Sequence, residues 1–365
     1  MTGIDDLLRL TVEKGASDLH VKAGSPPCVR IHTRLHVLRE MPPVSAQACY
    51  ELAQSMLNDA QVNQLDRGEE LDFAYSLAGV GRFRVNIFRQ RGSVEMAFRH
   101  VTHERPSFEE LGLPQVVRTL SEEPRGLVLV TGTAGSGKTT TLAAMIDHIN
   151  RTRDAHVVTI EDPIEVLHHD DQALISQREI GIDTESYGTA LRHVVRQDPD
   201  VILIGEMRDE ETVRAALTAA EIGNLVLSTL HTIDATETIN RIIDFFPPYQ
   251  QKQVRLMLAS TLKGIISMRL LPRLDGGLVP AVEVMVNTGT TKEYIANEQE
   301  TMKIKEAIEE GDYYGMQSFD QSLIDLYRRK LIGLDDAVAM AAHAHDFKLK
   351  IQQLGPLDDD DFLPI

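Results

Sequence analysis

The chain has 365 residues, of which 42% are hydrophobic and none is Trp, and this length predicts two or three globular domains. Its net charge of −18 argues against a broad nucleic-acid-binding surface, so we expect no nucleic-acid partner. No apolar run approaches the roughly 20 residues that cross a bilayer and the chain start lacks a basic signal segment, so the cytoplasm is expected, with Cys28 and Cys49 reduced.

The first hundred residues predict a small α+β domain, bounded at residues 1–101. Strand signals alternate with turn signals, and one helix precedes the first strands while a second lies between the early and the late strands. Residues 102–114, with Pro106, Gly112 and Pro114, predict a linker. The expected elements are helices over residues 4–13 and 45–65 and strands over residues 19–21, 29–37, 71–77, 82–89 and 93–99.

Arginines cluster on one predicted strand of this domain. The first hundred residues hold 12 basic and 12 acidic side chains, and five of the basic ones lie between Arg82 and Arg99. Strand alternation places Arg82 and Arg84 on one face of the strand and Arg89 on the other face. Arginines that assist phosphoryl transfer are often supplied by a neighbouring molecule. Solvated or acid-paired arginines remain the alternative interpretation.

The second predicted domain covers residues 115–354 and has an α/β pattern. Apolar strands at residues 127–131, 156–161, 201–205 and 224–228 alternate with helices, which indicates a parallel sheet with helices on both faces. After His231 we expect mainly helices, with two short strands near Leu270 and at 281–286. The acidic end, residues 355–365, is expected to be disordered.

A glycine-rich stretch joins the first of these strands to a helix and fits G-x-x-x-x-G-K-[ST]. Backbone N–H groups of such a loop wrap phosphates, Lys138 is expected to reach the β- and γ-phosphates, and Thr139 is expected to ligate Mg²⁺. We therefore predict that the chain binds ATP with Mg²⁺. The expected nucleotide-binding residues are Gly132, Thr133, Ala134, Gly135, Ser136, Gly137, Lys138, Thr139 and Thr140.

Acidic side chains follow two of the other strands, at the sheet edge that carries the glycine loop. Glu206 follows the strand at 201–204 and is the predicted catalytic base. Glu161 and Asp162 end the strand at 156–160 and are expected to position Mg²⁺ and water, because Mg²⁺ keeps most of its hydration shell. Glu161 and Glu206 would act on the metal through water.

His231 follows the strand at 224–228 and reaches the same edge. A histidine is more often structural than functional, but an imidazole N–H at this position can contact a γ-phosphate. We predict that His231 senses the γ-phosphate.

Taken together, these motifs resemble the type IV pilus retraction ATPases, the PilT/PilU family of the secretion ATPase superfamily. The resemblance covers nearly the whole chain and rests on several motifs besides the glycine loop. They are Gly-Ala-Ser-Asp-Leu-His at 15–20, Gly-Arg-Phe-Arg-Val-Asn at 81–86, Thr-Ile-Glu-Asp-Pro-Ile-Glu at 159–165, Ile-Gly-Glu-Met-Arg-Asp at 204–209 and Ser-Thr-Leu-His-Thr at 228–232 with residues 240–247.

The resemblance implies a PAS-like N-terminal domain, a RecA-like motor domain and a homohexamer with ATP between subunits. It also implies pilin depolymerisation and twitching motility, driven at the inner face of the cell membrane through an inner-membrane pilus platform protein. By motif, it implies Glu206 as base, Glu161 and Asp162 around Mg²⁺ and water, His231 near the γ-phosphate, and Arg82, Arg84 and Arg89 as contacts in trans.

Several roles stay open within this resemblance. Extension and secretion motors usually carry an extra domain and a four-cysteine zinc module, which this chain does not accommodate, so retraction is favoured over that alternative. Residues 291–304 depart from the motif of the PilT subfamily, whereas 262–265 and 315–323 look closer to PilU. The chain is therefore either a retraction motor or an accessory ATPase that assists a paralogue. A partner that binds ATP with little hydrolysis is a further alternative.

Overall fold

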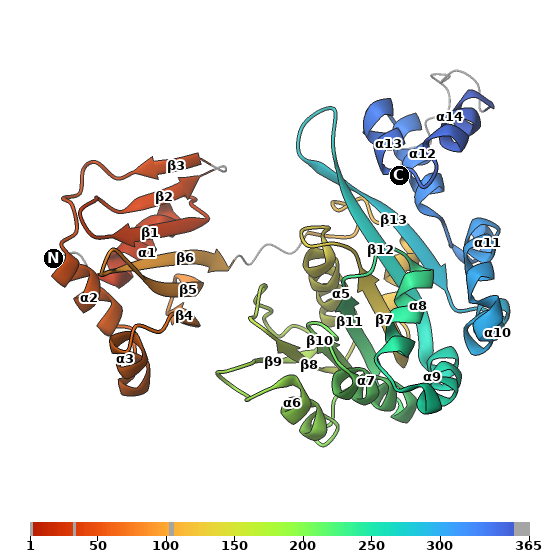
Figure 1. Ribbon diagram of the computed structural model, residues 1–365, viewed down its shortest axis with the longest axis horizontal. Coiled ribbons are helices and arrows are strands. Elements are labelled where there is room, and N and C mark those ends of the chain that lie inside the picture. The colour runs from red at the N-terminus through yellow and green to blue at the C-terminus, as the bar shows by residue number, and fades with distance from the viewer. Residues whose placement is uncertain (1–2, 32–33, 102–105, 354–365) are drawn as a thin grey trace. The chain divides into compact units, whose positions relative to one another are not determined.

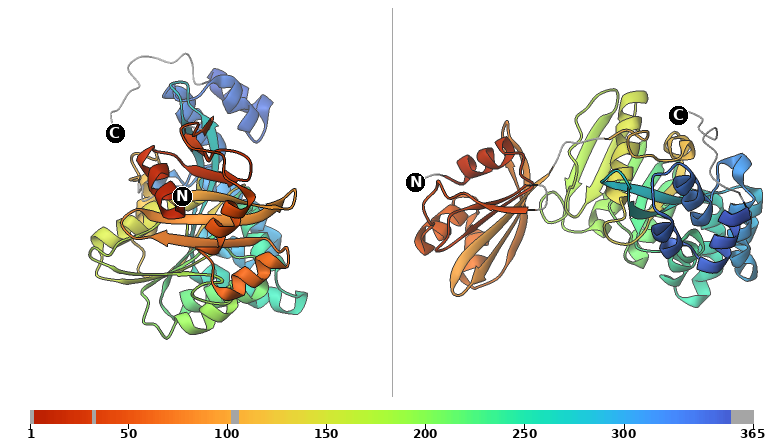
Figure 2. Two further views of the ribbon diagram at one scale, coloured as in Figure 1. Left: turned by 90° about the vertical axis from the view of Figure 1, so that its left-hand side faces the viewer. Right: turned by 90° about the horizontal axis from the view of Figure 1, so that it is seen from above.

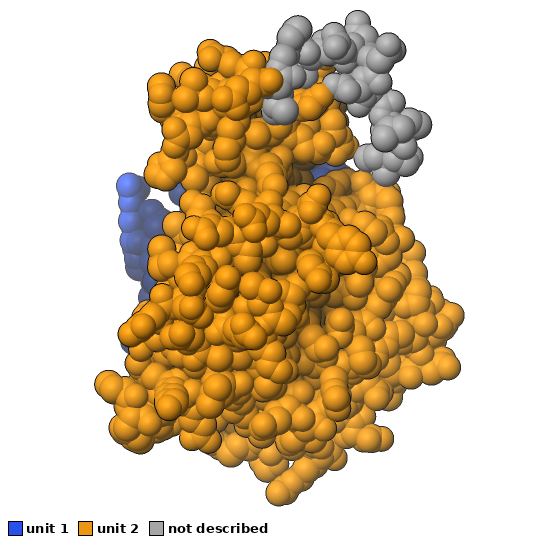
Figure 3. Space-filling model, turned by 90° about the vertical axis from the view of Figure 1, so that its right-hand side faces the viewer, with its two compact units in different colours: residues 1–104, 163–167 blue, residues 105–162, 168–365 orange. Residues whose placement is uncertain are grey.

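The computed structural model describes residues 3–31, 34–101 and 106–353. The chain divides into two compact units, which Figure 3 distinguishes by colour: unit 1 is residues 1–104 with 163–167, and unit 2 is residues 105–162 with 168–365. In the part of the chain that is described, no helix is both long and apolar enough to cross a membrane. The predicted acidic tail lies outside the described residues.

Unit 1 is a six-stranded antiparallel sheet in the order β3-β2-β1-β6-β5-β4, with three helices packed on one face (Figures 1 and 2). Its strands are β1 (Asp18–Lys22), β2 (Cys28–Ile31), β3 (Arg34–Val37), β4 (Leu71–Leu77), β5 (Gly81–Gln90) and β6 (Ser93–Val101). Its helices are α1 (Ile4–Glu13), α2 (Ala46–Gln54) and α3 (Asp59–Asp66).

Alternation along the strands gives unit 1 its covered face and its open face. Phe83, Val85 and Ile87 are fully buried under the helices, and the residues between them point away from that core.

Two boundaries differ from the sequence-based prediction. The strand predicted over 29–37 is a pair of antiparallel strands, and the helix predicted over 45–65 is two helices. The second helix restarts at Asn58, whose side chain accepts a hydrogen bond from the Gln61 N–H in a capping box.

Unit 2 is built on a seven-stranded mixed sheet in the order β13-β12-β7-β11-β10-β8-β9. Its strands are β7 (Gly126–Thr131), β8 (His156–Glu161), β9 (Leu174–Glu179), β10 (Val201–Ile204), β11 (Leu225–Leu230), β12 (Leu262–Pro272) and β13 (Leu278–Val286). Its α-helices are α4 (Gln115–Ser121), α5 (Lys138–Thr152), α6 (Tyr187–Val194), α7 (Glu210–Ile222), α8 (Ala235–Asp244), α9 (Pro248–Thr261), α10 (Gly289–Ala296), α11 (Ile304–Glu309), α12 (Phe319–Arg328), α13 (Leu334–Met340) and α14 (Ala344–Gln353). Two 3₁₀ helices, η1 (Glu298–Lys303) and η2 (Asp312–Tyr314), complete it.

Both faces of this sheet are buried, which explains why its strands read as continuous apolar runs. On β7, Leu127 and Leu129 pack with helices α6 to α9. Val128 and Val130 point to the other face and pack with α4 and α5. The parallel strands β7, β8, β10 and β11 therefore end at one edge, between two helical layers (Figure 1).

Two parts of this sheet differ from the prediction. The strands expected to be short near Leu270 and 281–286 form an antiparallel hairpin of 11 and 9 residues, and β12 extends the sheet beside β7. The parallel edge strand β9 was not predicted, because its residues Leu174 to Glu179 are mixed in polarity and half-buried at a sheet edge. The last helices, α12 to α14, pack their apolar sides on the far end of the hairpin.

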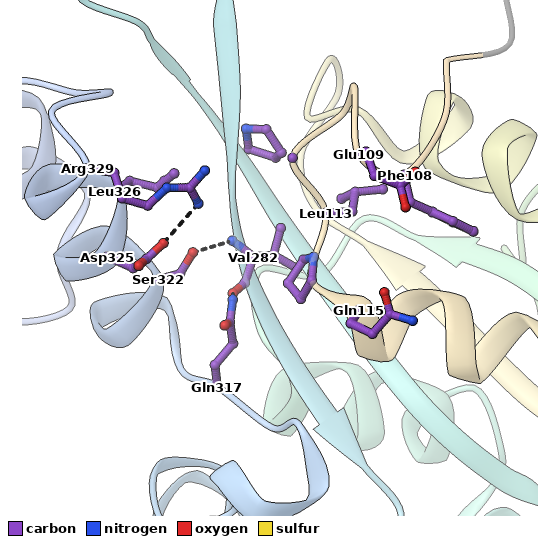
Figure 4. A pocket seen from close by; sticks show the side chains of 13 residues that line it. Phe108, Glu109, Leu113, Gln115, Val282, Gln317, Ser322, Asp325, Leu326 and Arg329 are labelled. Carbon is purple, nitrogen blue, oxygen red and sulfur yellow. Dashed lines mark hydrogen bonds and ion pairs between the residues drawn. The ribbon is translucent and has the colours of Figure 1, made fainter. Parts of the chain in front are cut away.

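Part of the segment that was predicted to be a linker packs against the helices of unit 2. Phe108 and Leu113 are buried against the α4–α5 layer. Figure 4 shows a cavity of about 250 Å³ beside them, between this segment, β13 and α12. Ser322 Oγ accepts a hydrogen bond from Val282 N at 3.0 Å, and Arg329 pairs with Asp325 at 3.2 Å on its wall. This cavity is distinct from the one at the glycine loop.

Candidate active site

The glycine loop, residues 132–137, leaves the end of β7 and enters α5 in a conformation that needs glycine. Gly132 has φ 144° and Gly137 has φ 98°, backbone values that side-chain-bearing residues rarely adopt. A Cβ atom on Gly132 would also collide with the Ser136 hydroxyl and lie 2.6 Å from the carbonyl oxygen of Met268 on β12. The loop is thus held tightly against β12 with its backbone free of side-chain obstruction.

Lys138, the first residue of α5, is folded back onto this loop. Its side chain is 8% exposed, and Nζ donates hydrogen bonds of 2.8 Å to the carbonyl oxygens of Gly132 and Thr133. The hydroxyl of Ser136 is buried in the same turn without a hydrogen-bond partner. A buried cation, an unsatisfied hydroxyl and the start of a helix are the groups that an anionic phosphate chain would satisfy. The residues present therefore fit a nucleotide triphosphate.

A cavity of about 380 Å³ lies beside the loop and has one largely apolar wall. Residues 132–136 form one side, and Ile233, Met268, Leu270 and Met340 supply apolar surface on the other. Apolar surface next to a phosphate site suits a nucleotide base. Sequence reasoning missed these residues because they come from β12, α13 and the segment before α8, and no local motif marks them.

Glu206 and His231 meet at the ends of the neighbouring strands β10 and β11. His231 Nε2 lies 3.2 Å from Glu206 Oε2, and Glu206 also pairs with Arg208 through its other carboxylate oxygen. The Glu206 side chain is 15% exposed, whereas the His231 ring is half exposed. The two residues that the sequence proposed separately as base and sensor are therefore in contact. Arg208 was not predicted to be a site residue, and only its contact with Glu206 identifies it as one.

Burial lowers the pKa of His231 from 6.5, and the nearby positive charges of Lys138 and Arg208 lower it further. The ring is consequently neutral near pH 7. Since an ionised carboxylate can only accept a hydrogen bond, Nε2 carries the ring hydrogen and donates it to Glu206. The influence of Lys138 on this pKa also indicates that the histidine and the loop lysine act in one electrostatic environment.

Glu161 ends β8 as a buried carboxylate, with 8% of its surface exposed. It accepts hydrogen bonds from Thr159 Oγ1 at 2.7 Å and Gln177 Nε2 at 3.2 Å. Gln177 comes from β9, so the unpredicted edge strand helps to hold this candidate. Asp162, the next residue, is exposed.

A preformed metal cage is absent among the described residues, in which no group of three or more His, Cys, Asp or Glu side chains is arranged to hold a metal ion. This is compatible with Mg²⁺, which usually binds with one or two protein oxygens together with substrate phosphates and water. Thr139 and Thr140 are exposed in the first turn of α5, next to Lys138. The oxygen donors of Thr139, Glu161 and Glu206 are chemically suited to this hard cation.

The three candidate arginines of β5 have partners inside unit 1. Arg84 makes a bidentate pair with Asp72, with distances of 3.0 and 3.2 Å. Arg82 donates to Ser76 Oγ at 3.2 Å, and Arg89 donates to the Leu65 carbonyl at the end of α3 at 3.1 Å. The Arg84 pair is about half exposed on both sides, so it contributes little to stability and is readily exchanged for another anion.

The site in unit 2 defines a P-loop nucleoside triphosphatase, because the loop, its lysine and the strand-end carboxylate lie at one edge of a parallel sheet. A family model for type II/IV secretion system proteins matches residues 2–311. The chain belongs to this family.

Similarity to known relatives extends over nearly the whole chain. It is 42% identical to the type IV pilus retraction ATPase PilT of Pseudomonas aeruginosa over 344 residues, covering 94% of this chain and 99% of the relative. It is 40% identical to the type IV pilus ATPase PilU of the same organism over 360 residues, covering 98% and 94%. The crystal structure of the pilus retraction motor PilT with bound ADP matches with a TM-score of 0.89 at 42% identity, covering 96% of this chain and 100% of that one.

These findings confirm three predictions from the sequence. The resemblance to the retraction ATPases is confirmed by identity over most of the chain. The α/β fold class, with a RecA-like ATPase domain and a smaller N-terminal α+β domain, is confirmed by the structural match. The chain is an ATPase of the secretion family, as expected from its glycine loop.

Proposed function

We propose that the protein is an ATP-hydrolysing motor that drives type IV pilus retraction, and thereby twitching motility. The observation that carries this proposal is the match to a retraction ATPase over 99% of that relative's length. The contact between Glu206 and His231 and the glycine cradle support a hydrolytic rather than a purely binding role. A partner that binds ATP without hydrolysing it would not need this base and its histidine.

In the proposed reaction, the amides of residues 132–137 hold the phosphates and Lys138 leaves its two loop carbonyls to contact them. Glu206 accepts the proton of the attacking water, and the neutral His231 ring orients Glu206 through its single N–H, which is proposed to turn to the γ-phosphate when the nucleotide binds. Thr139 and, through water, Glu161 and Glu206 would hold Mg²⁺, whose charge would offset that of the phosphates. Asp162 is proposed to position water.

We also propose a homohexameric ring in which Arg82, Arg84 and Arg89 act on a neighbour's nucleotide. The exposed, exchangeable pair of Arg84 with Asp72 supports Arg84 as the strongest of the three. Arg89 is the weakest, since it holds the Leu65 carbonyl of its own unit. The proposed partner is an inner-membrane pilus platform protein, which would place the ring at the cytoplasmic face of the membrane.

The direct test is to delete the gene and follow labelled pili by microscopy in cells that carry the wild-type or a variant gene. Loss of retraction with the deletion, restored by the wild type and by Glu210→Gln but not by Glu206→Gln, is expected. Glu210 is a suitable control because it is a partly exposed acid paired with Arg214 on α7. Normal retraction in the deletion strain would refute the proposed motor role.

An accessory role beside a paralogous ATPase is the second candidate, favoured by the 40% identity to PilU over 98% of this chain. Residues 291–304, where the sequence departs from the PilT motif, run from the third residue of α10 through η1 to the first residue of α11. Purified protein alone and with the paralogue would separate the two roles. Retraction that persists in the deletion strain but weakens under load, together with ATPase activity that needs the paralogue, would support assistance.

A further inference from the structure

Glu283 is a buried acid on β13 that the proposed hydrolysis does not use. Its side chain is 6% exposed, and Oε1 accepts a hydrogen bond of 2.9 Å from the N–H of Ala235. Ala235 is the first residue of α8, whose N-cap is Asp234. Glu283 thus satisfies a backbone donor at the start of a helix, where a negative charge is favoured by the helix dipole.

The segment that Glu283 fixes also carries His231. Residues 231–234 connect the end of β11 to α8, and Thr232 Oγ1 is hydrogen-bonded to Thr238 Oγ1 at 2.6 Å, which ties this connection to the first turn of the helix. The place of His231 therefore depends on β11 at one end and on the start of α8 at the other. A shift of α8 would change the 3.2 Å contact between His231 and Glu206.

A second residue connects Glu283 to the nucleotide cavity. Arg269 on β12 lines both the cavity beside the glycine loop and a separate cavity of about 60 Å³ that contains Glu283. Arg269 Nη1 donates to the Met340 carbonyl on α13 at 2.7 Å, and its guanidinium lies 3.8 Å from the ring centre of Phe319 on α12. The cluster therefore touches the nucleotide cavity, the His231 segment and the C-terminal helices.

The charges around Glu283 are balanced closely enough for it to titrate near neutral pH. Burial raises its pKa to about 7; the Ala235 N–H and the positive charges of Arg269 and Lys305 oppose this, whereas the negative charge of Asp234 adds to it. Two further acids, Glu309 on α11 and Asp320 on α12, face the same small cavity. The charge of this group changes in the range where the cell operates.

We propose that Glu283 is a positioning residue whose ionised form holds the start of α8, and with it His231, in the arrangement that hydrolyses ATP. A hydrogen bond from an N–H to a carboxylate is about twice as strong as one to a neutral acid. Protonation of Glu283 therefore loosens the Ala235 contact and reduces turnover. Through Arg269, this state is coupled to the packing of α12 and α13 against the hairpin.

The test is the pH profile of ATP turnover for wild type, Glu283→Gln and Glu309→Gln. Between pH 6.5 and 8, wild type and Glu309→Gln are expected to rise about threefold as a single group ionises. Glu283→Gln is expected to change less than twofold over the same range. An unchanged rise in Glu283→Gln, or its loss in Glu309→Gln, would overturn the proposal.

A second variant keeps the test decisive if Glu283→Gln does not fold. Ala235→Pro removes the N–H at the first helical position, where the backbone of proline is well tolerated and Asp234 before it is already extended; because it also adds ring carbons at a fully buried position, a thermal melt checks that the variant folds. Because the ionised form of Glu283 then has no Ala235 N–H to hold, turnover is expected to be reduced and to change less than twofold between pH 6.5 and 8, as in Glu283→Gln. A pH profile and turnover equal to those of wild type would show that the Ala235 contact has no positioning role.

Discussion

His231 Nε2 lies 3.2 Å from Glu206 Oε2, and this contact joins the ends of two parallel strands at the phosphate-binding edge of the sheet. The backbone supports the alignment, because Thr229 on β11 donates from its hydroxyl to the Gly205 carbonyl at 2.7 Å and the Met207 N–H donates to the Thr229 carbonyl at 3.1 Å. The base and the histidine are therefore held by the sheet itself.

Replacement of Glu206 by Gln is expected to lower ATP turnover by about 10²-fold or more, since removal of one preorganised group typically has an effect of this size. Nucleotide binding should survive, because the glycine loop and Lys138 are untouched. Single-turnover hydrolysis and binding of a fluorescent ATP analogue measure the two separately. Glu210→Gln is the matched control, and near-normal hydrolysis in Glu206→Gln would rule out Glu206 as the base.

The pH dependence of turnover should contain an acidic limb that belongs to His231. Its pKa is lowered from 6.5, so the ring is neutral near pH 7 and becomes protonated only in more acidic solution. A protonated ring pairs with Glu206 as a cation and weakens it as a base. Turnover is therefore expected to fall as pH drops through this lowered pKa, in wild type and in Glu283→Gln alike.

The control for this assignment is His231→Asn, which keeps a hydrogen-bond donor but does not titrate in this range. In the Glu283→Gln background, where Glu283 no longer titrates, its residual activity should lack the acidic limb. The same lowered pKa means that the folded state binds protons less readily at His231 than the unfolded chain does, so this group reduces stability as pH falls through its folded pKa. An acidic limb that remains in His231→Asn would assign it to another group.

Arg84 allows the ring proposal to be tested by mixing two inactive proteins. Subunits with Arg84→Ala retain Lys138, and subunits with Lys138→Ala retain Arg84, so a mixed ring contains sites in which a wild-type arginine can meet a wild-type loop. The mixture is expected to recover a measurable part of the wild-type turnover. Arg9→Ala, a change on the exposed side of α1, serves as the control for loss of charge.

Failure of the mixture, with intact rings shown by size-exclusion chromatography and light scattering, would contradict supply of the arginine in trans. Asp72→Asn extends the experiment, because it removes the present partner of Arg84 without touching the arginine. If Arg84 is exchanged between Asp72 and a neighbour's phosphate, Asp72→Asn should keep or raise the turnover.

Local sequence patterns predicted the parts of the site that follow strands directly. Lys138, Glu161, Glu206 and His231 each stand at a strand end or helix start, and parallel strands bring such ends to one edge. Partners from distant segments were not predictable in this way. Gln177 reaches Glu161 from an edge strand of mixed polarity, and Arg269 and Glu283 come from a hairpin that was expected to be shorter.

For the fold as well, features set by the local sequence were predictable and features set by long-range packing were not. Apolar runs such as β7 and β10 were evident because both faces of the sheet are covered. The break between α2 and α3 depended on one capping side chain, Asn58, inside a continuous helical pattern. The pairing of β12 with β7 is set by packing between segments more than a hundred residues apart, which periodicity along the chain does not encode.

Gly132 provides a test of the loop that does not remove any functional side chain. Gly132→Ala places a Cβ against Ser136 and 2.6 Å from the Met268 carbonyl, in a backbone conformation that L-residues avoid. We expect a loss of roughly 1–3 kcal/mol in unfolding free energy, as for other overpacked sites. ATP affinity should fall as well, because the loop has to move away from β12.

Gly289→Ala is the matched control, since no atom lies within 4 Å of its Cβ position and it lies in the first turn of α10. Thermal melts with and without ATP measure both effects. If Gly132→Ala melts like Gly289→Ala and is stabilised equally by ATP, the loop is not held against β12 as the structure indicates.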